Sequence, residues 1–109
     1  MKVEEYIRED GSNPYQKWFN RLDPIAAAKV AVAIVRVELG NTSNIKWLGS
    51  IGEYRIDWGP GYRIYLAAEG RNLIILFGGG TKKRQGADIK RAIALHNEYL
   101  ARKRKQTEE

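Results

Sequence analysis

The sequence predicts a single α+β domain in which a helical hairpin packs on a small, twisted, mainly antiparallel sheet. The chain has 109 residues, enough to bury one hydrophobic core but not two. Capping and proline signals begin two helices in the N-terminal half, and strand-like segments separated by turn residues follow them. The predicted order is β-α-α-β-β-β-α, and a grouped run of strands of this kind is typical of the α+β class.

The N-terminal half supplies the first strand and the helical hairpin. Residues 2–8 alternate loosely between polar and apolar and predict a strand at a sheet edge. Ser12 followed by Pro14 predicts the start of a helix. Asp23 and Pro24 repeat that signal, and the second helix is expected to run to about Leu39, where Gly40-Asn41 stops it. Its inward residues include Ile34 and Val37.

The C-terminal half supplies the sheet and the last helix. Three antiparallel strands are predicted at residues 51–58, 62–68 and 72–77. The continuously apolar run Leu73–Phe77 belongs in the interior of the sheet, and the glycines 78–80 are expected to end that strand. A basic helix is predicted from about Ala87. His96 shares its helical spacing with Ile93 and Leu100, which indicates a structural position beside the core.

The segment Glu53–Leu66 predicts a hairpin with one apolar and one polar face. Gly59-Pro60-Gly61 has the composition of a turn, and a three-residue loop would pair Trp58 with Tyr62 and Asp57 with Arg63. The polar face, expected to meet solvent, would carry Glu53, Arg55, Asp57, Arg63 and Tyr65. Two interpretations remain open: cross-strand ion pairs, which contribute about 0–1 kcal/mol each when exposed, or a phosphate-binding surface built on guanidinium groups.

Composition and charge narrow the function classes. The net charge is +6; residues 1–81 hold ten Lys/Arg and nine Asp/Glu, whereas residues 82–109 hold nine and four. This basic C-terminal quarter indicates a polyanionic or acidic partner, with a solubilising tail as the alternative. The absence of cysteine excludes disulfides and cysteine-based chemistry. The N-terminus is charged and no apolar run reaches membrane-spanning length, so we expect a cytoplasmic protein. We expect no metal or other cofactor.

An ordered set of motifs carries a family resemblance. It comprises Leu48-Gly49, Glu53-x-Arg55, Gly59-Pro-Gly-Tyr-Arg63-x-Tyr65 and Gly78-Gly-Gly-x-Lys82-x-x-Gln85-x-x-Asp88-Ile89. Together they resemble the RelE/ParE toxin superfamily, specifically the phage-related addiction-module killer proteins close to the HigB-type toxins. The likeness extends from Trp18 to the last helix. One position departs from the branch, since Thr81 stands where members commonly carry an acidic residue.

The resemblance implies the toxin of a type II toxin–antitoxin system, held inactive by a cognate antitoxin in a hetero-oligomer. RelE- and HigB-like members enter the ribosome and cleave mRNA, using a ribose 2′-OH as the attacking group. ParE-like members share the fold but poison DNA gyrase, and a non-catalytic, partner-binding member is a third alternative. A two-histidine ribonuclease mechanism is excluded, because the chain has one histidine.

The resemblance also assigns roles to individual residues. Arg63 would stabilise the transition-state phosphate with Arg55 as its partner, Lys46 would act as base or anchor, and Lys82 would contact the leaving side. Glu53 would hold Arg55 or accept a proton. The RNA-binding set would be Lys83, Arg84, Tyr65, Lys90 and Arg91. Other interpretations are a solvated loop position for Lys46, packing for Tyr65, an ion-pair partner for Glu53, and ribosomal-RNA contacts alone for Lys82–Arg84.

Overall fold

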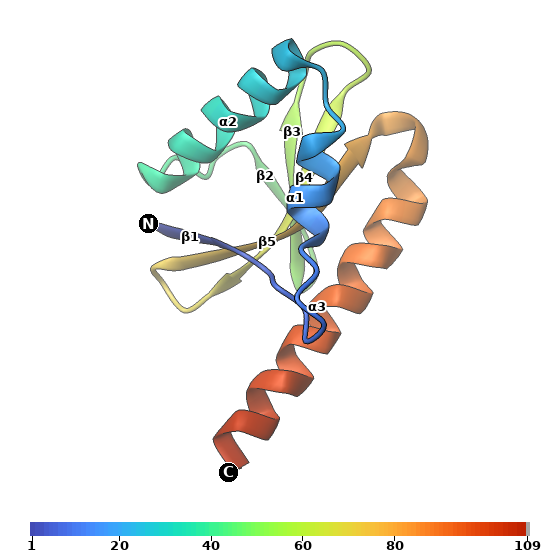
Figure 1. Ribbon diagram of the computed structural model, residues 1–109. Helices are drawn as coiled ribbons and strands as arrows, with labels where there is room; N and C mark the ends of the chain where they lie inside the picture. Colours follow the sequence, from blue (N-terminus) through green and yellow to red (C-terminus); the bar gives the residue numbers. More distant parts are fainter. Residues whose placement is uncertain (109) are drawn as a thin grey trace.

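The computed structural model describes residues 1–108 and contains five strands and three α-helices (Figure 1). In chain order they are β1 (Lys2–Glu5), α1 (Pro14–Asn20), α2 (Pro24–Glu38), β2 (Ile45–Leu48), β3 (Ile51–Ile56), β4 (Tyr62–Glu69), β5 (Leu73–Thr81) and α3 (Gln85–Glu108), with a 3-10 turn at Lys82–Arg84 before α3. The α+β class is confirmed.

The two N-terminal helices begin at capping side chains followed by proline. Asp23 caps α2 as predicted, because its carboxylate accepts a hydrogen bond of 2.9 Å from the backbone N–H of Ala26. The predicted cap of α1 is wrong by one residue. Asn13, not Ser12, accepts from the backbone N–H of Gln16 at 3.0 Å, while the Ser12 hydroxyl donates to Asp10.

The sheet has the order β1-β5-β4-β3-β2 and is mixed, because β1 pairs with β5 in parallel and all other pairs are antiparallel. The first strand lies at an edge, as predicted. Strand β2 was not predicted, and it places Lys46 in the sheet opposite Glu53 and not in a preceding loop. Four residues give too short an alternation to be distinguished from a loop by sequence.

The predicted pairing of the β3–β4 hairpin is wrong by two residues. Arg55 lies opposite Arg63 and Ile56 opposite Tyr62, so the connection comprises residues 57–61 and not 59–61. Asp57 therefore lies outside the strands and does not join the polar face. The division into two faces is unaffected, since a shift of two residues preserves the alternation of side chains across a strand.

The glycines at 78–80 were predicted to end strand β5. This prediction is wrong, because the strand continues through them to Thr81. A bulge interrupts its pairing, because Leu66 lies opposite Leu76 while Tyr65 lies opposite Gly78, which leaves Phe77 as the extra residue. The glycines allow neighbouring side chains to approach. A Cβ atom on Gly79 would collide with the Trp18 ring, and one on Gly80 would collide with the Asp88 carboxylate.

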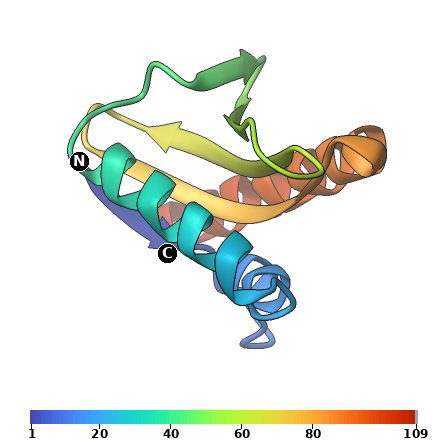
Figure 2. The same cartoon turned by 90° about the horizontal axis from the view of Figure 1, so that it is seen from above.

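Helices cover both faces of the sheet. Helices α1 and α2 pack on the face that presents Tyr54, Ile64, Leu66, Ile74 and Leu76, and their own contributions include Trp18, Val30 and Val37. Helix α3 packs on the opposite face, where Leu95 contacts the Phe77 cluster and Ala92 lies with Ile51 and Tyr65. Seen from above, α2 runs along one side of β5 (Figure 2).

Helix α3 is longer than the sheet that it covers, and its C-terminal turns project beyond the rest of the molecule (Figure 1). His96 is buried on the inner side of α3 against Phe77 and Tyr99, as predicted. Ile93 and Leu100, predicted to share its face, are exposed, because the buried face is centred on Ala92 and Leu95. Within residues 1–108, no helix combines the length and the apolar character needed to cross a membrane.

Candidate functional site

The polar face of the hairpin, predicted to be in solvent, is largely buried under α3. The exposed fractions of Glu53, Tyr65 and Arg63 are 0%, 1% and 7%. Only Arg55, at the margin of the covered area, keeps about half of its side chain exposed (46%). The prediction of a solvated face is therefore wrong, because α3 lies across these strands and seals a charged group beneath it.

Glu53 is the centre of this buried arrangement. One carboxylate oxygen accepts a hydrogen bond from Nε of Arg55 at 2.9 Å, and the other accepts from the side-chain amide of Gln85 at 2.8 Å. Nε of Arg63 lies 3.7 Å from the second oxygen, an ion-pair separation and not a hydrogen bond. We call Glu53, Arg55, Arg63 and Gln85 the Glu53 cluster.

The electrostatics of the cluster keep Glu53 ionised. Burial raises the pKa of its carboxyl, but the hydrogen bonds from Arg55 and Gln85 and the charges of both arginines outweigh burial and leave the pKa below its ordinary value. A carboxylate with a lowered pKa and two engaged oxygens is a poor general base. The geometry thus favours the ion-pair interpretation of Glu53, in which it positions the two guanidinium groups.

Arg63 is fixed by a second contact at the end of the hairpin loop. Its Nη1 donates to the backbone carbonyl of Gly61 at 2.8 Å, and the same carbonyl accepts from the backbone N–H of Lys82 at 2.9 Å. Gly61 has a φ of +74°, a left-handed conformation that glycine adopts without strain. The carbonyl oxygen of Gly61 therefore links the hairpin loop both to Arg63 and to the segment that follows β5.

The structure brings some of the predicted site residues together and separates others. Lys46, Glu53 and Tyr65 lie in one row across β2, β3 and β4, and Arg55 and Arg63 lie in the next row. Lys46 is exposed, and Lys82 is exposed where the chain leaves β5. The remaining basic residues, Lys83, Arg84, Lys90 and Arg91, are exposed along the 3-10 turn and α3.

Tyr65 does not form part of an exposed binding surface. Its ring is buried beneath α3 beside Ala92, and its hydroxyl lies near the Glu53 carboxylate without forming a hydrogen bond of standard geometry. Burial raises the pKa of this phenol, and the negative charges of Glu53 and Asp88 raise it further. The packing interpretation of Tyr65 therefore describes the structure, with the ring against α3 and the hydroxyl beside the Glu53 carboxylate.

Two residues of the site had no role assigned from the sequence. Gln85 hydrogen-bonds Glu53, and Asp88 lies over Gly80, where burial raises the pKa of its carboxyl despite the nearby charges of Arg84 and Arg91. The glycine run was the available signal, since consecutive strand glycines mark close approach of another segment. Among the described residues, no group of three His, Cys, Asp or Glu side chains could hold a metal ion.

The fold and the site define a small basic α+β protein whose sheet holds a buried carboxylate between two arginines. No known protein-family profile matches the chain. A protein of Haemophilus influenzae described as uncharacterised is 41% identical over 86 residues, which cover 77% of this chain and 87% of that protein. The chain belongs to the same family as this protein.

Proposed function

We propose that this protein is a RelE-like toxin of a type II toxin–antitoxin system and acts as a ribosome-dependent mRNA endonuclease. The observation that carries the proposal is the pair of arginines on neighbouring strands, held by one buried carboxylate beside exposed lysines. Two fixed guanidinium groups suit an anionic phosphorus centre, because preorganised positive charge stabilises the developing charge of a transition state.

The reaction requires proton transfers at two oxygens. The ribose 2′-OH loses its proton to a base, its oxygen bonds to the adjacent phosphorus, and the P–O5′ bond breaks as an acid protonates the leaving oxygen. The products are a 2′,3′-cyclic phosphate and a 5′-hydroxyl. Arg55, half exposed, would contact the phosphate directly. Arg63 would contribute its charge from just beneath the surface. Lys46 would act as base or anchor on one side of the scissile bond, and Lys82 would contact the leaving group on the other side.

Two further surfaces support the proposed partners. The projecting end of α3 carries the exposed residues Arg104 and Lys105, and phosphate contacts of ribosomal RNA would suit them. On α2, the apolar side chains of Ile25, Val32, Val35 and Leu39 are at least half exposed, with Lys29 and Arg36 beside them. An exposed apolar stripe with basic margins fits a protein partner with acidic side chains, as an antitoxin would be.

The burial of Glu53 and Arg63 favours one alternative. A gyrase inhibitor on the same fold would need these charges only for stability, and an interior ion pair is what such a role predicts. The two functions differ in what is damaged: message in one case, DNA held by gyrase in the other. Supercoiling assays that show accumulation of cleaved DNA–gyrase complexes would therefore favour the alternative.

The first test is primer extension on a reporter mRNA in a reconstituted translation system. We expect discrete cuts that appear only on translated message and are lost with Arg55→Ala and Arg63→Ala. Arg71→Ala is the matched control, because Arg71 is an exposed arginine of the β4–β5 turn outside the Glu53 cluster. Thermal unfolding of each variant separates loss of activity from loss of fold. Intact message with unimpaired translation, or cuts that survive Arg55→Ala in a folded protein, would contradict the proposal.

A further inference from the structure

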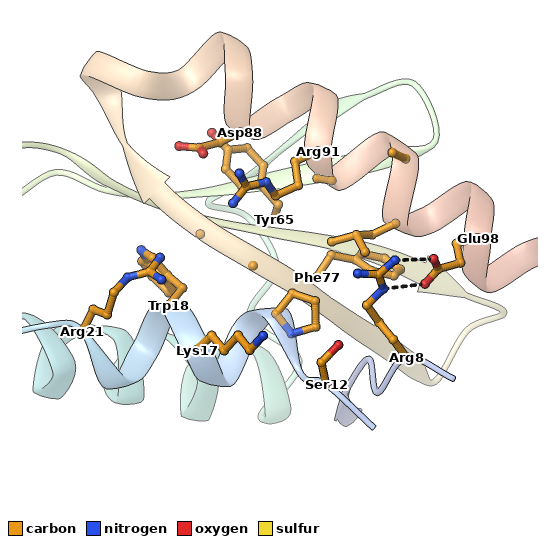
Figure 3. Close-up of a pocket in the computed structure, with 16 residues that line it drawn as sticks. Arg8, Ser12, Lys17, Trp18, Arg21, Tyr65, Phe77, Asp88, Arg91 and Glu98 are labelled. Carbon is orange, nitrogen blue, oxygen red and sulfur yellow. Dashed lines mark hydrogen bonds and ion pairs between the residues drawn. The ribbon is translucent and has the colours of Figure 1, made fainter. Parts of the chain in front are cut away.

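A groove lies between α1 and α3, with the glycines of β5 as its floor (Figure 3). Its volume is about 390 Å³, within the range of sites that hold small ligands. Tyr65, Phe77 and Trp18 contribute to its lining, whereas Glu53, Arg55 and Arg63 do not. The groove is therefore a separate feature from the Glu53 cluster, and Tyr65 is the residue that connects the two.

The floor of the groove is a free strand edge. Strand β1 pairs only with residues Leu73–Leu76 of β5, so the second half of β5 has a neighbouring strand, β4, on one side alone. Gly78 and Gly79 line the groove at this point, and although the Trp18 ring packs over Gly79, nothing lies within 4 Å of where a Cβ of Gly78 would be. Backbone N–H and C=O groups at an unpaired edge are available to a ligand.

The walls of the groove carry unneutralised positive charge. Lys17 and Arg21 come from α1, and Arg91 comes from α3 on the opposite wall (Figure 3). None of the three makes an ion pair with the side chains that the structure describes, residues 1–107, in contrast to Arg8, which is bound to Glu98 at 2.8 Å at the end of the groove. Cations from two elements thus surround one cavity.

The groove also offers groups that recognise more than charge. Trp18 lines it with an aromatic ring, and Asp88 provides carboxylate oxygens that accept a hydrogen bond from no described residue. Glu98 is already engaged by Arg8 and Tyr6. A nucleobase has flat apolar faces, exocyclic amino groups that donate to carboxylates, and a phosphate on either side. The side-chain carboxylates of an acidic peptide would be repelled by Asp88, whereas the exocyclic amino group of a base would donate to it.

We propose that the α1–α3 groove binds one nucleotide of single-stranded RNA, with the base over Gly78 and the flanking phosphates on Lys17, Arg21 and Arg91. The choice of RNA rests on the proposed function, because the strand held here would be the message. The groove then anchors the message outside the Glu53 cluster, none of whose residues line it, and its cations belong to substrate binding and not to cleavage.

The test is fluorescence anisotropy with a fluorescein-labelled single-stranded RNA of about eight nucleotides, long enough to cover one such site. We expect Lys17→Ala/Arg21→Ala to weaken binding about tenfold at low salt and to reduce the salt dependence by the equivalent of about two phosphate contacts. Lys2→Ala/Arg71→Ala is the matched control, since it removes the same charge from exposed positions on β1 and the β4–β5 turn. It should change affinity by about twofold or less, as general electrostatics alone would.

If the two double variants weaken RNA binding equally, the groove is not a binding site, because the RNA would then be attracted by the overall positive charge and not by a particular place on the surface. Absence of RNA binding by the unaltered protein, together with capture of a Glu-rich peptide that depends on Lys17 and Arg21, would overturn it in favour of a protein partner. Cleavage of translated message is measured in parallel. If the unaltered protein cuts the message but its RNA binding does not depend on the groove, the proposed function stands and the groove is not an RNA site. If RNA binding depends on the groove but the message stays intact, the groove is an RNA site and the proposed function is wrong.

Discussion

The side-chain amide of Gln85 donates a hydrogen bond of 2.8 Å to the carboxylate of Glu53, 32 residues earlier in the chain. Gln85 is the first residue of α3, and Glu53 is fully buried in β3. The contact joins the start of the covering helix to the charged centre beneath it. Through this amide, the position of α3 and the orientation of the two arginines are coupled.

We expect Gln85→Leu to lower the free energy of unfolding by about 1–3 kcal/mol, because a buried carboxylate oxygen loses its hydrogen bond. Urea denaturation at neutral pH measures the change. Gln16→Leu is the control, since its amide also donates to a side chain, Asn20, but at an exposed site where the loss should be about 0.5 kcal/mol or less. Equal effects of the two substitutions would show that burial of the acceptor is irrelevant.

Glu53→Gln keeps the shape of the side chain and removes its charge. Its amide group would present N–H donors to Arg55 or Gln85, and two guanidinium groups would lose their counter-ion, so we expect a loss of about 3 kcal/mol at pH 7. The pKa of Glu53 is lowered in the folded protein, so its stabilisation is present above its ordinary value of 4.5 and is lost as pH falls through the lower folded pKa. The difference between the two proteins should therefore shrink in acid. A difference that is constant from pH 7 to pH 3 would contradict the assigned ionisation.

Gly80→Ala tests the close approach of α3 to the sheet. The added Cβ would collide with the Asp88 carboxylate, so the helix or the strand must shift, at an expected cost of about 1–3 kcal/mol in unfolding free energy. Combining it with Asp88→Ala should restore much of that loss, as a double-mutant cycle would show. Gly86→Ala, where the new Cβ meets nothing within 4 Å, should be neutral or stabilising by about 0.5 kcal/mol. A purely additive cycle would mean that Asp88 is not what excludes a side chain at position 80.

His96 should make stability depend on pH between neutrality and mild acid. Burial lowers its pKa below the ordinary 6.5, so the unfolded chain binds the proton more readily than the folded protein. The stability is thus lost as pH falls below about 6.5 towards the folded pKa. His96→Phe keeps an aromatic ring against Phe77 and Tyr99 and should flatten the midpoint temperature between pH 7.5 and pH 5. An unchanged slope in the variant would assign the pH dependence to other groups.

The sequence was sufficient for the class of the fold and for the two faces of the hairpin. Its turn residues and alternation predicted Ile64 and Arg63 on opposite faces correctly, although the pairing of Arg55 was wrong by two positions. The reason is physical. Side-chain direction in a strand repeats every two residues, so the alternation fixes the faces, whereas the length of a Gly- and Pro-rich loop sets the register and is weakly specified.

Burial of the site could not be predicted from the same pattern. Glu53 and Arg63 are charged, and a charged strand face is usually solvated, since desolvating a charge is costly unless a partner is in place. The partners that make burial possible are Arg55 and Gln85, and the latter comes from a helix more than thirty residues away. The small residues Ala92 and Gly80, which let that helix approach, become informative only once their neighbours are known.

The unpaired half of β5 has a consequence for the solubility of the protein. An open strand edge is a template on which a second molecule can add, and copies that meet edge to edge can continue into aggregates. The bulge at Phe77 interrupts the regular edge, and Lys17, Arg21 and Arg91 place like charges where two such edges would meet. We therefore expect these cations to disfavour edge-to-edge contact between copies of the chain, and a change that neutralises them to promote self-association.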